Sequence, residues 1–218
     1  MGNFVVERVV NPSDAEIKAS VNLFIDLMKT DISVLSLVGN ELELIPVMIE
    51  AMLRAGALEG EYYTATNEEG VLVGYAMWMP PGRDLFGTET QRSLGLYDFM
   101  SRLPEATKEY YRDTYMAQFP NFVSDNLGPT GKTDAWWLHQ AMVRRDYHRQ
   151  GICKAFVGAI LGKTKGKKVT LGTTTTADEN IAVYTGLGFK QKATMAMPSL
   201  LGDWPIHLFE LRTEDDLE

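Results

Sequence analysis

The strongest constraint on the fold is the order of patterns between residues 135 and 175. An apolar run at 135–143 predicts a buried strand, a mostly apolar run at 151–161 predicts a helix, and a β-rich run at 168–175 predicts a second strand. Parallel neighbouring strands need a long crossover connection, usually a helix, whereas a tight hairpin can join only antiparallel strands. Two strands joined by a helix therefore usually lie parallel in one sheet. The chain is therefore expected to be a mixed α/β protein with a parallel strand pair.

The flanking segments predict hairpins and helices around this unit. A turn of Asn, Glu, Glu and Gly at 67–70 separates two strand patterns and predicts a hairpin. Ser13, with Glu16 three residues later, predicts a capped helix start. The remaining expected elements are strands at 62–66, 71–79, 192–197 and 206–212, and helices at 42–55 (ended by Gly56) and 180–187 (ended by Gly188).

Residues 83–131 form the least regular stretch of the sequence. Helices are expected at 90–101 and 104–119, with Pro104 in a first helical turn. A loop of Leu, Gly, Pro, Thr and Gly follows at 127–131. No linker or repeat interrupts the chain, so residues 1–218 are interpreted as one domain with a helical insertion at about 83–131.

Charge is distributed unevenly along the chain. The formal net charge is -8, which argues against a general nucleic-acid-binding protein. Residues 144–168 nevertheless contain eight basic residues and one acidic residue, Asp146. A positive segment inside an acidic protein suits a small polyanionic ligand, although a solvated surface is the alternative.

The basic segment begins in the turn between the first strand and the helix. Free backbone N–H groups at the start of a helix bind anions, and Gly151 lets the backbone approach a phosphate closely. Neither the Walker phosphate loop nor the Gly-x-Gly-x-x-Gly pattern after a strand is present, which disfavours nucleotide hydrolases and dehydrogenases.

This turn resembles the acyl-coenzyme A signature of the GNAT superfamily, Gln/Arg-x-x-Gly-x-Gly/Ala. Residues 147–155 read Tyr-His-Arg-Gln-Gly-Ile-Cys-Lys-Ala, with His148 where Gln or Arg is usual and Cys153 where Gly or Ala is usual. Residues 180–189 read Asn-Ile-Ala-Val-Tyr-Thr-Gly-Leu-Gly-Phe and resemble the second GNAT motif, shortened by one residue before the tyrosine. The resemblance covers residues 135–190 and is greatest to puromycin-type and fungal small-molecule acetyltransferases.

The resemblance implies a fold, a cosubstrate and roles for individual residues. The fold is a mostly antiparallel twisted sheet with one splayed parallel pair and flanking helices, and the cosubstrate is acetyl-CoA. Met142 and Val143 would offer backbone groups to pantetheine, Asn180 would touch it, and Tyr184 would protonate the leaving thiolate. The pyrophosphate would be surrounded by His148, Arg149, Gln150, Gly151 and Cys153, with added charge from Lys154.

Other candidates carry competing interpretations. His139 titrates near neutral pH and is a candidate base, with a structural histidine as the alternative. Asp134 and Glu179 are weaker candidates for the same role. Without the motif, Tyr184 would be interpreted as a packing residue. The histidines and Cys153 show no metal-ligand spacing, so no metal is expected.

The sequence thus predicts an acetyltransferase that acts on a small-molecule acceptor, with an amine favoured over a hydroxyl. The alternatives are a non-catalytic acyl-CoA-binding module of the same fold and a protein N-acetyltransferase. A lone cysteine excludes an intrachain disulfide, and no apolar run is long enough for a membrane span. Residues 1–11 show no basic segment followed by an apolar stretch, so no secretory signal is expected. A cytoplasmic protein is therefore expected, and the oligomeric state is left open.

Overall fold

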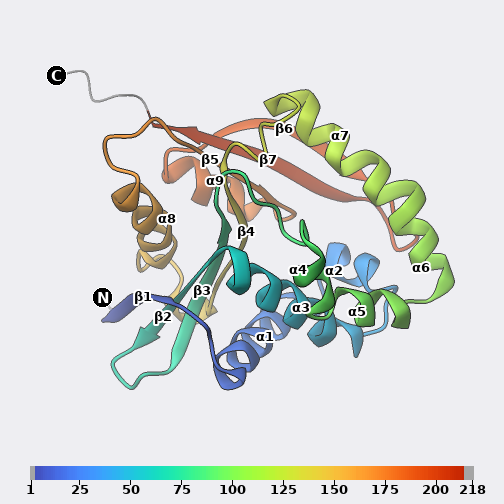
Figure 1. Ribbon diagram of the computed structural model, residues 1–218, viewed down its shortest axis with the longest axis horizontal. Coiled ribbons are helices and arrows are strands. Elements are labelled where there is room, and N and C mark those ends of the chain that lie inside the picture. The colour runs from blue at the N-terminus through green and yellow to red at the C-terminus, as the bar shows by residue number, and fades with distance from the viewer. Residues whose placement is uncertain (1–2, 214–218) are drawn as a thin grey trace.

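The computed structural model describes residues 3–213, which form a seven-stranded sheet in the order β1-β2-β3-β4-β5-β7-β6 (Figure 1). The strands are β1 (Phe4–Val9), β2 (Glu61–Asn67), β3 (Leu72–Met79), β4 (Trp136–Val143), β5 (Thr170–Thr175), β6 (Lys190–Met197) and β7 (Trp204–Arg212). The main helices are α1 (Asp14–Met28), α2 (Ile32–Leu37), α3 (Leu44–Glu59), α8 (Ile152–Lys163) and α9 (Glu179–Gly186).

The sheet confirms the predicted fold class. Strands β4 and β5 pair in parallel, whereas the other neighbouring strands in the described part of the chain pair antiparallel. Helix α8 joins the parallel pair, as the order of the sequence patterns predicts.

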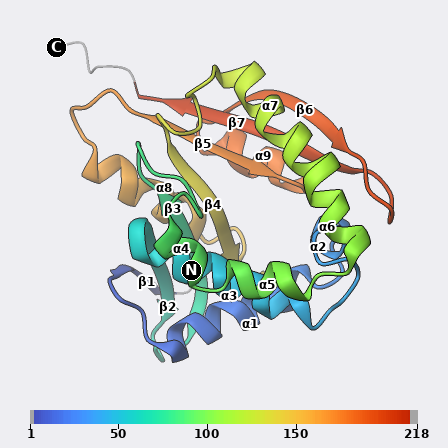
Figure 2. The same ribbon diagram turned by 45° about the vertical axis from the view of Figure 1, so that its right-hand side comes forward.

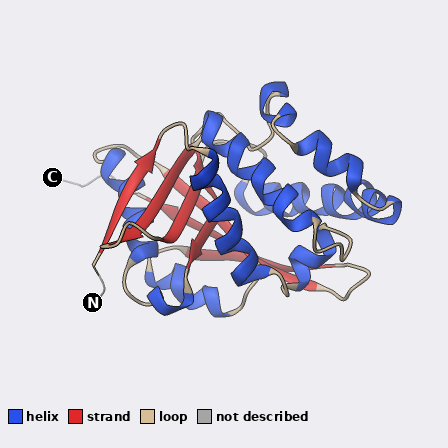
Figure 3. Ribbon diagram, turned by 90° about the horizontal axis from the view of Figure 1, so that it is seen from below, coloured by secondary structure: helices blue, strands red, loops and turns tan. Residues whose placement is uncertain are grey.

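Helices cover both faces of the sheet and bury a separate core on each (Figure 3). Successive side chains of a strand point to opposite faces, so Tyr62 packs with α1 and α3 whereas Tyr63 packs on the side of α8. The predicted capping box is present, because the Glu16 backbone donates to Ser13 Oγ and the Glu16 carboxylate accepts from Ser13 N.

Two N-terminal predictions need correction. Gly56 does not end a helix, since α3 continues to Glu59. A Cβ on Gly56 would lie 2.0 Å from Met77 Sδ, so glycine is needed there for close contact with β3. The sequence analysis also missed β1 and α2, both of which are only six residues long.

The insertion is helical but more broken than predicted. Its elements are α4 (Glu89–Ser93), α5 (Leu96–Arg102), α6 (Glu105–Tyr110), a π-helical turn (Tyr111–Tyr115) and α7 (Met116–Leu127). Gly95, at φ 138°, separates α4 from α5. Figure 2 shows α5, α6 and α7 running along the side of the sheet where β4 diverges from β5 and β7.

Candidate active site

The centre of the candidate site is the gap between β4 and β5. Their pairing covers three residue pairs and ends at Leu138–Thr173. The next residue, His139, is skipped in the pairing with β3, because Met77 pairs with Gln140 and Trp78 with Leu138. Such a bulge bends its strand. Beyond it, the edge of β4 is open to a ligand.

The peptide groups of β4 alternate in direction along this edge. Arg144 N donates to Val73 O at 2.8 Å, so the peptide groups of Arg144 face β3. By alternation those of Val143 face the gap and those of Met142 face β3. Of the two predicted pantetheine contacts, Val143 therefore directs its backbone toward the gap, where its carbonyl lies 2.8 Å from His148 Nε2 and its N–H is the group left for a ligand.

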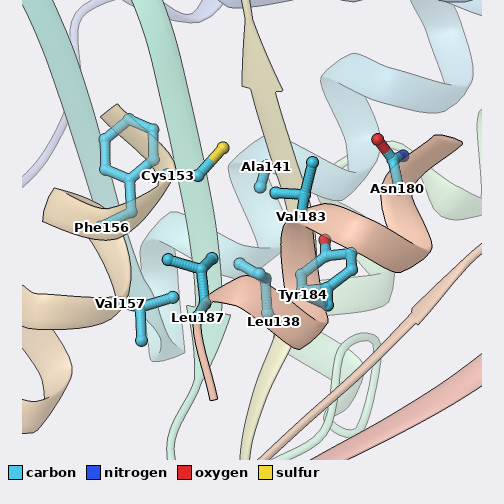
Figure 4. Close-up of a pocket in the computed structure, with 9 residues that line it drawn as sticks. All are labelled: Leu138, Ala141, Cys153, Phe156, Val157, Asn180, Val183, Tyr184 and Leu187. Atoms are coloured by element: carbon cyan, nitrogen blue, oxygen red, sulfur yellow. The ribbon is translucent and has the colours of Figure 1, made fainter. Parts of the chain in front are cut away.

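A narrow cavity lies beside this edge of β4, between β4, α8 and α9 (Figure 4). Its walls are Leu138, Ala141, Cys153, Phe156, Val157, Asn180, Val183, Tyr184 and Leu187. Residues from β4, α8 and α9 thus converge on one space, and three of them, Cys153, Asn180 and Tyr184, belong to the predicted site. The lining is apolar apart from these three side chains, which suits a thin, mostly aliphatic chain.

Tyr184 projects from α9 into this cavity (Figure 4). Its ring packs against Phe189 and Phe209, which fixes its position. Burial raises the pKa of Tyr184 to about 12, with the neighbouring Cys153 adding to the rise and Thr173 opposing it. The phenol therefore stays protonated at neutral pH, which is the state that a general acid requires.

Helix α9 is held in place at its N-terminus. Asn180 Nδ2 donates to Thr175 Oγ1 at 2.9 Å, and His207 Nε2 lies 2.8 Å from Asp178 Oδ1. His207 is buried and its other ring nitrogen contacts Thr194, so the histidine has a structural role.

The turn before α8 forms the second part of the site. Arg149 has φ 61°, and Gly151 has φ 95° at the N-cap of α8. A Cβ on Gly151 would meet no atom within 4 Å, so the space in front of the helix is open. Exposed Arg149 and Lys154 flank this space. The arrangement suits a phosphate group at the helix N-terminus.

Two predicted phosphate ligands use their side chains within the protein. His148 Nε2 lies 2.8 Å from Val143 O, and Gln150 Nε2 donates to Asp146 O at 2.9 Å. Both contacts tie the turn to itself or to the end of β4. If these two residues contact a phosphate, they would therefore do so through their backbone N–H groups and not through their side chains.

Cys153 lies in the narrow cavity with Tyr184, and burial raises the pKa of its thiol to about 11. The thiol is therefore a poor nucleophile near neutral pH. We expect iodoacetamide to modify Cys153 slowly at pH 7, where about one thiol in 10⁴ is ionised, and faster as the pH rises. CoA should protect the thiol, as peptide mass spectrometry would reveal. Alkylation at an equal rate with saturating CoA would contradict placement of pantetheine in this cavity.

A second, larger cavity of about 810 Å³ lies between the sheet and the insertion helices. Aromatic and apolar side chains form most of its wall, including Phe86, Phe99, Tyr111, Tyr115, Phe119 and Trp137. Tyr111, Tyr115 and Phe119 follow one another along the π-helical turn and α7, with adjacent ring centroids 5.7 and 5.4 Å apart. Leu138 lines both cavities, so one buried side chain forms part of the wall of each, at the last β4 residue that pairs with β5.

His139 lies in the second cavity beside two charged residues that the sequence analysis did not identify, Asp84 and Lys132. Lys132 Nζ is 2.7 Å from Asp84 Oδ1 and 2.9 Å from Oδ2. His139 Nε2 is buried without a hydrogen-bond partner and lies 3.7 Å from Asp84 Oδ1. Antiparallel pairing of β3 with β4 joins Met79 to Trp137, so the loops that carry Asp84 and Lys132 must meet. A prediction of the β3–β4 pairing from the sequence could therefore have brought Asp84 and Lys132 together.

The three groups influence one another's ionisation. Burial lowers the pKa of His139, Lys132 lowers it further, and Asp84 opposes the change. Burial alone would raise the pKa of Asp84, but His139 and Lys132 outweigh that effect and hold it well below its ordinary value. His139 is therefore neutral and Asp84 ionised at neutral pH.

The weaker base candidates do not reach this cavity. Asp134 is exposed and accepts a hydrogen bond from Thr130, and Glu179 is exposed at the start of α9. Within residues 3–213 no cluster of three or more His, Cys, Asp or Glu could hold a metal ion. None of the helices in the same range is both long and apolar enough to cross a membrane.

Comparisons with known proteins identify the fold. No protein-family model matches the sequence, and no curated protein matches it. Among solved structures, a Corynebacterium glutamicum protein named as histone acetyltransferase and related acetyltransferase superposes with a TM-score of 0.64 at 15% identity, over 100% of both chains. A mosquito arylalkylamine N-acetyltransferase-like protein gives 0.59 at 11% identity, over 97% of this chain and 100% of the other. The polyamine N-acetyltransferase of Drosophila melanogaster gives 0.55 at 10%, with the same coverages.

These similarities define the class: the chain has the fold of the GNAT acetyltransferases. The predicted fold is thereby confirmed, whereas identities this low do not transfer an activity or an acceptor. No comparison singles out the puromycin-type or fungal enzymes.

Proposed function

We propose that this protein transfers the acetyl group of acetyl-CoA to the amine of a small molecule. The observation that carries the proposal is the shared wall of the two cavities at Leu138. Tyr184 lines the narrow cavity and His139 lines the larger one. A proton donor and a proton acceptor thus flank the point where an acyl group would meet its acceptor.

The residues around the narrow cavity fit the cosubstrate. The open N-terminus of α8 suits its phosphates, and Asn180 borders the space for its pantetheine arm. When bound, acetyl-CoA supplies an activated acyl group. His139 accepts the proton of the attacking amine, and Tyr184 donates one to the departing sulfur.

The second cavity favours an amine with an apolar body. Its aromatic wall suits rings or alkyl chains, and its ionised Asp84 suits a cationic group. The insertion helices cover this cavity, which leaves less room for a polypeptide acceptor. The arylalkylamine enzyme among the similar structures is consistent with such an acceptor.

An acceptor panel with acetyl-CoA tests the proposal. We expect thiol release and an N-acetyl product with 2-phenylethylamine, less with ethylamine, and none with 2-phenylethanol. Better turnover of peptides with a free N-terminus or lysine would favour the protein N-acetyltransferase. CoA binding without turnover of any amine would favour the non-catalytic module.

The fall of kcat at acidic pH should follow the protonation of His139. Only neutral imidazole accepts a proton, and burial lowers the pKa of His139 from 6.5. At saturating substrates kcat should therefore stay level from pH 7.5 to pH 6.5 and fall only at lower pH. His139→Gln should have low activity without this fall at acidic pH. A wild-type midpoint above pH 6.5, or an unchanged fall in His139→Gln, would remove His139 from the mechanism.

A further inference from the structure

The second cavity already holds an ammonium group, that of Lys132. Lys132 Nζ contacts both carboxylate oxygens of Asp84, at 2.7 and 2.9 Å. The same atom lies 5.7 Å from the centroid of the Trp137 ring. A carboxylate and an aromatic face are the two partners that bind a cationic amine. Asp84, Lys132 and Trp137 all line the cavity.

A proton acceptor lies at the same position. His139 Nε2 is buried without a partner, and 3.7 Å from Asp84 Oδ1 is too far for a direct hydrogen bond. One nitrogen placed between these two atoms can be about 2.8 Å from both. An ammonium group there would satisfy the orphaned imidazole nitrogen and keep the carboxylate paired.

Lys132 is able to leave this position. It belongs to the turn before β4, and its side chain retains 24% of its exposure. Its long, flexible stem lets the ammonium group move into water without a change in the backbone. Asp84 would then need a new cation, because a partly buried carboxylate without a partner is costly.

We propose that Lys132 occupies the binding site for the acceptor's ammonium group, and that the acceptor displaces it from Asp84. This inference rests on the proposed function, in that the displacing cation is the amine to be acetylated. Its N–H bond then breaks as a new N–H bond forms at His139 Nε2. The resulting imidazolium is stabilised by Asp84, and the neutral amine keeps the electron pair with which it attacks.

Binding of two matched probes tests this inference without turnover. The cationic probe is 2-phenylethylamine and its uncharged counterpart is 2-phenylethanol, each titrated by calorimetry. Lys132→Met should bind the amine about fivefold more tightly than the wild type, because the internal competitor is gone. The affinity for the alcohol should not change. Lys132→Gln, which can still donate to Asp84, should show the same preference with a smaller gain.

Two further variants complete the test. Asp84→Asn should weaken amine binding by about 30-fold or more and leave the alcohol unaffected. Lys108→Met removes another cation that lines the cavity but contacts Glu105 instead, so it should not tighten amine binding. Equal gains in Lys108→Met and Lys132→Met would indicate a general charge effect and overturn the inference.

Weaker or unchanged amine binding in both Lys132 variants, with melting temperatures near that of the wild type, would also overturn it. Acetyl transfer is measured separately on the same proteins. Turnover without tighter binding would retain the proposed function and reject the role of Lys132. Tighter binding without turnover would retain the ammonium site and reject the acetyltransferase.

Discussion

Gly151→Glu is expected to weaken CoA binding at least about 100-fold. The variant would lose several phosphate contacts, each contributing about one or two kcal/mol to the binding free energy, and together they account for a loss of this size. Gly151 adopts φ 95°, which disfavours any residue with a Cβ. The new side chain would enter the open space in front of α8 and place a negative charge where the phosphates are proposed to bind. Calorimetry with CoA measures the loss.

Gly158→Glu is the matched control for this variant. Gly158 is an exposed position of the same helix, and a Cβ there also meets no atom within 4 Å. It adds the same charge about two turns further along α8. We expect near-normal CoA affinity. Equal affinity in both variants, with both proteins folded, would reject the turn before α8 as the phosphate site.

Tyr184→Phe is expected to lower kcat by about 10²-fold, the lower end of the range for general-acid catalysis, because a thiolate is a good leaving group. The ring keeps its packing against Phe189 and Phe209, so the protein should fold. Since only the transition state loses an interaction, the affinity for CoA should change little. Steady-state kinetics with the best amine, together with a melting curve, gives both quantities.

Tyr97→Phe provides a comparison for the loss of a hydroxyl group. Tyr97 is exposed, and its hydroxyl donates to Glu89 outside both cavities. The kcat of Tyr97→Phe should equal that of the wild type. Normal kcat in Tyr184→Phe would mean that Tyr184 only packs, which was the alternative interpretation, and would favour the non-catalytic module.

Much of the fold was predictable because its strands and helices carry their own local signals. The strand–helix–strand order at 135–175 predicted the parallel pair, and the turn at 67–70 predicted the hairpin. Gly56 misled the prediction because glycine serves two purposes, helix termination and close packing, and only the tertiary contact with Met77 distinguishes them. Short elements such as α2 offer too few periodic residues to detect.

The candidate site was predictable only where a motif carried it. Tyr184 and Asn180 were found through the second GNAT-like motif, and both line the narrow cavity between β4, α8 and α9. Asp84 and Lys132 lie 48 residues apart in loops with no motif, and only the pairing of β3 with β4 brings them together. The bulge at His139 likewise depends on strand register, which the sequence does not reveal.

The most direct test of the central claim is a crystal structure of the protein with CoA and 2-phenylethylamine. We expect the pyrophosphate at the N-terminus of α8, the pantetheine arm between β4 and β5, and the thiol beside Tyr184. The amine should lie in the second cavity between Asp84 and His139, with Lys132 displaced into solvent. Density for CoA outside the gap between β4 and β5, at a surface away from Gly151 and Tyr184, would contradict the account.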